Sequence, residues 1–217
     1  MTAGQRRGRR IILWRHGRTS WNRERRFQGS TDIPLDETGT AQAARSARVL
    51  AALRPDAIIA SDLQRAAATG KALAELTDLP ITLRPELRET FAGRWQGITW
   101  DEIEDRFGAE LAAFRRGEEV RRGGDGELET EVAERSVPAV LEAADELPDG
   151  GTLVVASHGG TIRITIAALI GLHRENWSSL GGLSNCCWSV LSESDRGWRL
   201  TEHNAGSLPE PVVGDDT

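Results

Sequence analysis

The sequence predicts an α/β fold, a three-layer sandwich in which helices flank a mostly parallel sheet. Three short apolar runs are each followed, directly or after a loop, by a helical pattern. This alternation favours parallel strands, because each crossover helix packs on a face of the sheet. The length of 217 residues allows one domain with a sizeable core. We expect that domain over residues 9–204, with a small helical cap insertion at about 90–146 and flexible tails at 1–8 and 208–217.

The three apolar runs have the length and composition of buried strands. They cover residues 11–14, 57–60 and 153–156. The helical patterns that follow them cover residues 37–53, 62–76 and 160–170. Asp36 and Ser61 stand where N-caps of the first two helices are expected. A fourth strand is expected at 81–84.

The remaining segments predict a hairpin and a cap. Alternating residues on both sides of Asp195 and Gly197 predict a hairpin on the edge of the sheet. Thr99 and Glu102 form a capping box at the start of a helix, and a second helix follows a polar, glycine-rich loop. We expect these two helices to cover one edge of the sheet, and we expect Trp14 and Trp188 in the core.

The composition argues against several classes of protein. A net charge of -6 provides no general attraction to nucleic acid or to a membrane. The adjacent Cys186 and Cys187 predict reduced buried thiols in a cytoplasmic protein, with a reactive thiol as the lesser alternative. The first apolar segment is too short for a secretion signal, so we expect no export. The arginines before it predict a solvated basic tail; they are Arg6, Arg7, Arg9 and Arg10.

Histidines and arginines lie where the predicted strands end. Arg15 and His16 follow the first strand, and Arg65 lies in the first turn of the helix after the second. His158 and Gly159 follow the later strand. Ligands of open α/β sheets bind beyond the carboxyl ends of the strands, so we expect one shared crevice. Guanidinium groups and the amides of a glycine-flanked helix start both bind phosphate oxygens, so the pattern predicts an oxyanion site.

His16 is the candidate nucleophile, because a neutral imidazole has a lone pair that can attack phosphorus. Gly17 would keep side-chain bulk away from the phosphoryl group. A leaving alcohol needs a proton, and Glu89 is the candidate donor, with a pKa raised by the bound phosphate. No His-Glu-x-x-His or Cys-x-x-Cys motif is present, so we expect no metal and no cofactor. His173 and His203 are expected to be structural.

Four ordered motifs resemble the histidine phosphatase superfamily, the phosphoglycerate mutase-like proteins. They are "RHGRTSWN", "SDLQRA", "LRETFAGRWQG" and "SHGGTIR". The resemblance extends over nearly the whole chain, from residue 11 to about 204. It implies His16 as the phosphorylated nucleophile, Arg15, Arg65 and His158 as ligands of the phosphoryl group, and Glu89 as the proton donor.

Asn22 and Gln28 match family positions that also touch the phosphate or the substrate. The loop between them carries Arg23, Arg25 and Arg26, which either bind a second acidic group or lie solvated on the surface. We include Arg26 among the candidate substrate-binding residues.

The short segment after Glu89 resembles the phosphatase branch, because mutases of the family carry a longer insertion there. Three further segments resemble an actinobacterial group that acts on glucosyl-3-phosphoglycerate: "LRETFAGRWQGIT", "ENWSSLGGLSNCCWSVL" and "GWRLTEHNAGS". One departure is Leu128 after Gly126 and Glu127, where family members often have Ser or Thr. This change removes a hydroxyl expected near the site.

These observations predict a metal-independent phosphomonoesterase that hydrolyses a small phosphorylated metabolite, with neither nucleic acid nor membrane as a partner. A phosphoglycerate mutase-type transferase is one alternative. A non-catalytic binder of phosphorylated ligands is the other. The oligomeric state stays open, and a homodimer is one option.

Overall fold

The computed structural model describes residues 8–206, so the predicted tails fall almost entirely outside the described residues. Six strands form one sheet in the order β3-β2-β4-β1-β5-β6. Strands β1 to β4 pair in parallel, whereas β5 and β6 add an antiparallel hairpin at the edge, as predicted. The strands are β1 Arg10–Arg15, β2 Ala57–Ala60, β3 Ile81–Leu83, β4 Thr152–Ser157, β5 Trp188–Ser194 and β6 Gly197–Ala205.

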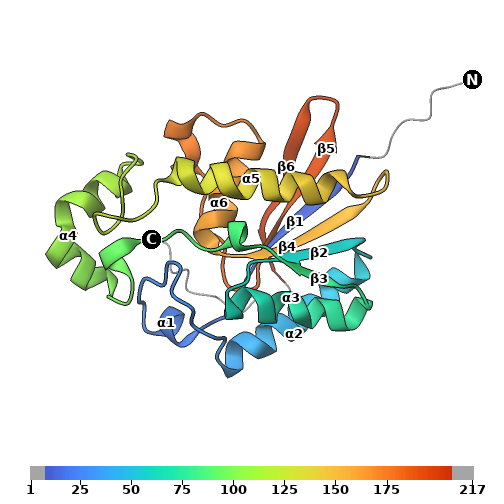
Figure 1. Cartoon of the computed structure of the whole chain (residues 1–217), viewed down its shortest axis with the longest axis horizontal. Coiled ribbons are helices and arrows are strands. Elements are labelled where there is room, and N and C mark those ends of the chain that lie inside the picture. The colour runs from blue at the N-terminus through green and yellow to red at the C-terminus, as the bar shows by residue number, and fades with distance from the viewer. Residues whose placement is uncertain (1–7, 207–217) are drawn as a thin grey trace, which may run out of the picture.

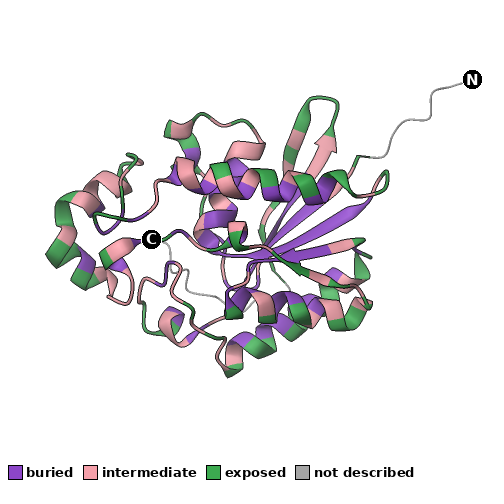
Figure 2. Ribbon diagram, viewed as in Figure 1, coloured by how far each residue is buried: buried purple, intermediate pink, exposed green. Residues whose placement is uncertain are grey.

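Helices cover both faces of this sheet, which confirms the predicted three-layer architecture (Figure 1). Helices α2 (Glu37–Ala52) and α3 (Gln64–Thr77) pack on one face. Helices α5 (Glu129–Asp145) and α6 (Gly159–Leu169) pack on the other. Strand β4 is buried along its whole length and β1 from Ile11 onward (Figure 2), as expected for a parallel sheet between two helical layers.

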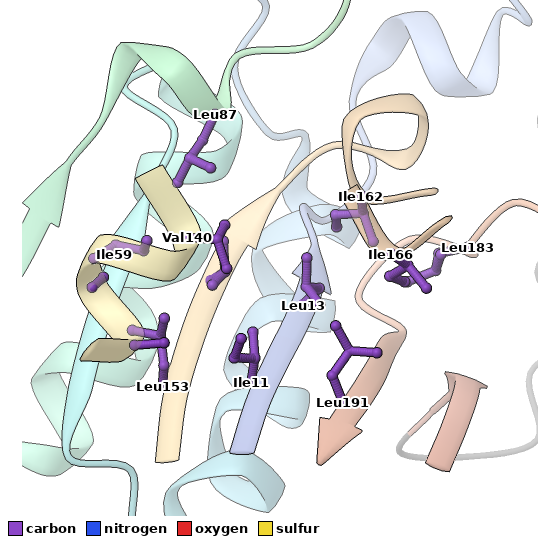
Figure 3. Close-up of a cluster of buried hydrophobic side chains, with 13 residues drawn as sticks. Ile11, Leu13, Ile59, Leu87, Val140, Leu153, Ile162, Ile166, Leu183 and Leu191 are labelled. Carbon is purple, nitrogen blue, oxygen red and sulfur yellow. The ribbon is translucent and has the colours of Figure 1, made fainter. Parts of the chain in front are cut away.

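Alternate residues of β1 fill the two cores. Ile11 and Leu13 meet Val140 of α5 and Ile166 of α6 in the cluster drawn in Figure 3. Trp14 points to the opposite face, where Trp188 is also buried, as predicted. Burying a large apolar side chain contributes roughly 1.5–3 kcal/mol, so these two clusters fix β1, and with it the residues that follow β1.

Two of the three predicted helix starts are confirmed, and one is wrong. Asp36 caps α2 by accepting from the Gly39 N–H over 2.7 Å. The capping box at Thr99 begins α4 (Trp100–Arg115), as predicted. The predicted N-cap at Ser61 is wrong, because α3 begins two residues later with Leu63 as its N-cap. The hydroxyl of Ser61 instead forms a hydrogen bond with a histidine, as described below.

The predicted cap differs from the structure in its second helix. Helix α4 stands apart from the sheet, around a small cluster that contains Trp95 and Leu111 (Figure 1). Helix α5 lies on the sheet, because its apolar stripe, including Val140 and Ala144, packs into the main core. Short helices that the sequence did not predict are α1 Ser20–Arg23, η1 Pro85–Leu87, η2 Gly93–Trp95 and η3 Arg174–Ser179.

The start of the described chain is less solvated than predicted. Arg9 pairs with Glu193 at 2.6 Å and with Asp145 at 2.8 Å, and Arg10 donates to the Thr152 hydroxyl. Arg6 and Arg7 lie outside the described residues. Within residues 8–206, no helix has the length and apolar character needed to cross a bilayer.

The two cysteines are free thiols. Cys186 is buried, as predicted, whereas Cys187 is only half-buried. Burial raises the pKa of the Cys186 thiol to about 12 and also raises that of Cys187. Since the thiolate is the reactive form, neither thiol has the environment of a nucleophile.

Candidate active site

The sheet topology brings the predicted strand ends together. Strand β4 lies between β2 and β1, and all three are parallel, so the segments that follow them share one edge. The rings of His16 and His158 lie there with centroids 5.2 Å apart, and both side chains are buried. A cavity of about 60 Å³ opens beside His16. It is lined by Arg15, His16, Asn22, Arg25, Arg26, Phe27, Gln28, Gly29, Arg65, Glu89 and Trp100.

Seven of the nine candidate site residues line this cavity, and only His158 and Gly159 do not. His158 is fully buried and contacts Arg65, and Gly159 is the buried first residue of α6. Of the loop arginines, Arg25 and Arg26 line the cavity, whereas Arg23 is exposed beside Glu24. Arg23 is therefore solvated, whereas binding of a second acidic group by Arg25 or Arg26 stays a prediction.

His16 has the protonation state that a nucleophile needs. Its Nδ1 lies 2.7 Å from the carbonyl oxygen of Gly17, which can only accept, so Nδ1 carries the proton and Nε2 keeps its lone pair. Burial, together with the charges of Arg65 and Arg15, holds the pKa of His16 well below its usual value. The imidazole is therefore neutral at physiological pH.

Gly17 allows a close approach between the turn after β1 and helix α2. A Cβ on Gly17 would collide with the backbone carbonyl of Gly39, in the first turn of α2. The predicted role of Gly17 in keeping side-chain bulk away from the phosphoryl group stays a prediction.

Arg65 holds several loops together at the bottom of the cavity. It donates to the carbonyl oxygens of Thr31 and Gly29, each over 2.7 Å, and from Nε to Nδ1 of His158 over 3.2 Å. The Nε2–H of His158 then donates to the Ser61 hydroxyl over 2.8 Å. Burial lowers the pKa of Arg65 to about 10, so its guanidinium group stays charged at neutral pH. Sequence reasoning assigned Ser61 to a helix cap and missed this contact.

Glu89 is fixed against the start of α6. Its carboxylate accepts from the N–H groups of Thr90 (2.9 Å), Gly160 (3.0 Å) and Thr161 (3.0 Å). The Thr161 hydroxyl lies 3.1 Å away as well. A Cβ on Gly160 would come within 2.7 Å of the carboxylate, so only glycine leaves room for it. Thr161 follows the histidine in "SHGGTIR", but nothing in that motif indicated its contact with Glu89.

The pKa of Glu89 is lowered in this structure. Burial raises the pKa, but the backbone hydrogen bonds from Thr90 and Gly160 and the charges of Arg65 and Arg122 outweigh it. The net effect lowers the pKa of Glu89, so the group is a carboxylate at neutral pH. The predicted rise depends on the negative charge of a bound phosphate, which would act in the opposite direction, and it stays a prediction.

Asn22 and Gln28 are oriented by side-chain hydrogen bonds. Asn22 accepts from the Thr19 N–H over 3.1 Å, and the Thr19 hydroxyl donates to Gln28 over 2.9 Å. Asn185 donates to the carbonyl oxygen of His16 over 3.1 Å and lies 3.4 Å from the Asn22 side-chain oxygen. Sequence reasoning missed Asn185, which comes from the loop before β5 and has no motif of its own.

The departure at Leu128 lies away from the catalytic cavity. Leu128 is the N-cap residue of α5, and its N–H donates to Glu131 over 2.9 Å. It is absent from the lining of the cavity beside His16. Among the described residues, no group of three or more His, Cys, Asp or Glu side chains could hold a metal ion.

A buried neutral histidine among arginines, with a carboxylate at the cavity wall, defines the class of site that phosphoryl-transfer enzymes with a histidine nucleophile need. The chain belongs to the histidine phosphatase superfamily (branch 1), whose family model matches residues 11–206. It is a phosphomonoesterase of this superfamily.

Relatives of known name cover almost the whole chain. A glucosyl-3-phosphoglycerate phosphatase of Mycolicibacterium vanbaalenii is 37% identical over 216 residues, which is 92% of this chain and 96% of that protein. A mycobacterial glucosyl-3-phosphoglycerate phosphatase solved with VO3 has a TM-score of 0.86 and 40% identity, over 91% of this chain and 100% of that one. The complex with inorganic phosphate has a TM-score of 0.83 and 39% identity, over 92% and 98% of the two chains.

Proposed function

We propose that this chain hydrolyses a small phosphomonoester through a phosphohistidine intermediate on His16. One observation carries the proposal: His16 is buried and neutral, and its Nε2 lone pair is available in the cavity that Arg15 and Arg65 also line. The arginines would stabilise the charge on the phosphoryl oxygens as it develops.

The proposed reaction has two steps. Nε2 of His16 forms a bond to phosphorus while the bond to the leaving oxygen breaks, and Glu89 gives its proton to that oxygen. Water then forms a new bond to phosphorus, the bond to His16 breaks, and Glu89 takes up the proton that the water loses. Glu89 is ionised in this structure, so the charge of the bound ester has to raise its pKa before the first step.

The proposed substrate is glucosyl-3-phosphoglycerate. The named relatives support it, since they carry this activity in their names and cover over nine-tenths of the chain. The three segments that resemble this group support it as well. For the mutase alternative, the phosphoryl group would have to return to an alcohol before water reaches it.

The test is phosphate release by the purified protein from glucosyl-3-phosphoglycerate, 3-phosphoglycerate, α-ribazole phosphate and sugar phosphates. We expect His16→Ala to abolish both turnover and the acid-labile phosphoenzyme. The matched control is His173→Ala, which changes an exposed histidine and should keep both turnover and the phosphoenzyme. An unchanged rate in His16→Ala would contradict the mechanism.

The same assay separates the alternatives. With 3-phosphoglycerate, free phosphate supports hydrolysis, whereas isomerised phosphoglycerate supports the transferase. Binding of phosphate esters without any release would support the non-catalytic binder. Comparable weak rates on all esters would leave a general phosphatase and contradict the named substrate.

A further inference from the structure

The turn after β1 contains two peptide groups, and the nucleophile binds one of them. Nδ1 of His16 donates to the carbonyl oxygen of Gly17 over 2.7 Å, which leaves the lone pair on Nε2. This hydrogen bond can hold the imidazole in place only if the plane of that peptide group is itself held. The contacts that fix the Gly17 carbonyl therefore decide how the nucleophile is oriented.

The other end of the same peptide group binds helix α2. The N–H of Arg18 lies in the peptide plane of the Gly17 carbonyl, and it donates to Oε1 of Gln42 over 2.9 Å. Because an N–H group can only donate, the side-chain oxygen of Gln42 has to face it, and not the nitrogen. Gln42, one peptide group and His16 thus form a chain of two hydrogen bonds that ends at Nδ1.

Two glycines allow Gln42 to come this close to the turn. Just as a Cβ on Gly17 would collide with the Gly39 carbonyl oxygen, a Cβ on Gly39 would collide with that of Arg18. Gln42 lies three residues after Gly39, on the same face of α2. Gln42 is only 8% exposed and Gly17 is buried, so the chain lies in a medium of low dielectric constant, where hydrogen bonds are stronger than in water.

The preceding peptide group, between His16 and Gly17, is held without Gln42. Its N–H donates to the hydroxyl of Thr69, in α3, over 3.1 Å. Its carbonyl oxygen accepts from the Asn185 side chain over 3.1 Å. The backbone is therefore fixed up to Gly17, and Gln42 acts on the second peptide plane alone.

Gln42 has two effects on His16 through this peptide group. It orients the carbonyl oxygen toward Nδ1, so the ring cannot turn without losing a buried hydrogen bond. It also polarises the peptide group, because hydrogen bonds in a chain strengthen one another. A stronger hydrogen bond at Nδ1 increases the electron density of the imidazole and makes Nε2 a better nucleophile. The carboxylate that orients the histidine of serine hydrolases likewise fixes its tautomer.

We propose that Gln42 is a positioning residue for the nucleophile, which holds the Gly17 carbonyl against Nδ1 of His16 and thereby selects the tautomer that can attack phosphorus. This role rests on the proposed hydrolysis at His16. It gives α2 a part in the first chemical step, although no residue of this helix lines the catalytic cavity.

The first test separates attack on phosphorus from binding of phosphate. Gln42→Met keeps the length of the side chain but removes the oxygen that accepts from Arg18. We expect kcat/KM for p-nitrophenyl phosphate to fall by roughly tenfold or more, because the imidazole is no longer held for attack. The inhibition constant of inorganic phosphate should stay within about twofold, since the arginines of the cavity are unchanged.

The second test observes the tautomer of His16 directly and needs no substrate. The chain has only four histidines, so long-range ¹H–¹⁵N spectra of labelled protein can be assigned, with His16→Gln identifying the signals of His16. In the parent we expect the proton on Nδ1. In Gln42→Met the Gly17 carbonyl is free to turn, so a share of the Nε2–H tautomer should appear.

A conservative variant and a matched control complete the design. Gln42→Glu keeps an acceptor oxygen and should restore kcat/KM to within about threefold of the parent. It should also move the Nδ1 proton of His16 downfield, because a charged acceptor strengthens the chain, and this shift replaces the other readouts if Gln42→Met does not fold. The control is Ser136→Ala, which removes a buried hydroxyl 2.8 Å from Thr165 on the other face of the sheet and should leave kcat/KM and the tautomer unchanged.

An unchanged kcat/KM or an unchanged tautomer in folded Gln42→Met would overturn this role of Gln42. So would an unmoved Nδ1 proton in Gln42→Glu, or a loss of kcat/KM as large as that of Gln42→Met, because the oxygen would then have no effect. Hydrolysis itself stands in each case. No phosphate release by the parent from any ester, together with no acid-labile phosphoenzyme, would overturn the proposed function instead.

Discussion

Arg65 donates from Nε to Nδ1 of His158 over 3.2 Å, and this contact fixes the tautomer of the histidine. An arginine N–H can only donate, so Nδ1 accepts and the ring proton lies on Nε2, facing the Ser61 hydroxyl. The same guanidinium group binds the carbonyl oxygens of Gly29 and Thr31. Arg65 thus connects the segments after β2 and β4 with the loop that carries Gln28.

Replacing Arg65 by lysine should lower kcat with p-nitrophenyl phosphate by about 10²-fold or more, as the loss of one preorganised donor typically does. A single ammonium group cannot reach three acceptors in the fork arrangement of arginine. Steady-state kinetics measure the loss. Arg88→Lys, at an exposed arginine that pairs with Asp62, is the control and should stay near the parent rate. A kcat for Arg65→Lys within threefold of the parent would count against this network.

Glu89→Gln should affect poor leaving groups most. An alkyl phosphate needs a proton on its leaving oxygen, so we expect its kcat to fall by about 10²–10⁴-fold. p-Nitrophenolate leaves without a proton, so hydrolysis of p-nitrophenyl phosphate should fall much less. The measurement is kcat for both esters in the parent and the variant. Equal losses would show that Glu89 does not act as the acid.

The buried histidines should make stability depend on pH. The pKa values of His16 and His158 lie well below their usual value because both are buried and close to arginine charges. Below about pH 6.5 the unfolded chain therefore binds more protons than the native one, so the free energy of unfolding decreases as the pH falls.

Each histidine contributes up to about 1.4 kcal/mol per pH unit once the pH is well below 6.5. Urea denaturation at pH 7 and pH 5.5 measures the change. His16→Gln removes one titrating group, so the variant should lose less stability between these two pH values than the parent. An identical loss in both proteins would contradict the lowered pKa of His16.

Gly160→Ala should separate activity from stability. The new Cβ would approach the Glu89 carboxylate to about 2.7 Å and displace it, so kcat should fall by roughly tenfold or more. Alanine favours the helix by up to about 1 kcal/mol, so the Tm should not fall in parallel. Gly108→Ala in α4 has no atom within 4 Å of its Cβ and is the control for helix propensity alone. Full activity in Gly160→Ala would contradict the close packing of Glu89.

The elements of the fold could be predicted because their signals are local. The apolar runs became β1, β2 and β4, and the capping residues Asp36 and Thr99 begin helices as expected. The predictions were wrong where contacts with a distant segment decide the structure. Ser61 binds His158 instead of capping α3, and α5 lies on the sheet because its apolar stripe matches that face.

The candidate site could be predicted in its residues but not in its contacts. The rule that parallel strand ends meet placed Arg15, His16, Arg65 and His158 together, and the need for a proton donor pointed to Glu89, whereas the resemblance added Asn22 and Gln28. The sequence could not predict which of these residues line the cavity, because that depends on how the segments pack. His158 lies behind Arg65 in the structure and does not line it.

The sequence by itself determined the α/β fold, the family and the residue types that can perform phosphoryl transfer, because periodicity and motifs are encoded in neighbouring positions. Only the tertiary structure decided the ionisation of Glu89 and the hydrogen bond from the turn after β1 to Gln42. Both depend on contacts between segments far apart in the chain. The pKa of a buried group and the strength of a buried hydrogen bond are set by these three-dimensional neighbours and by the exclusion of water.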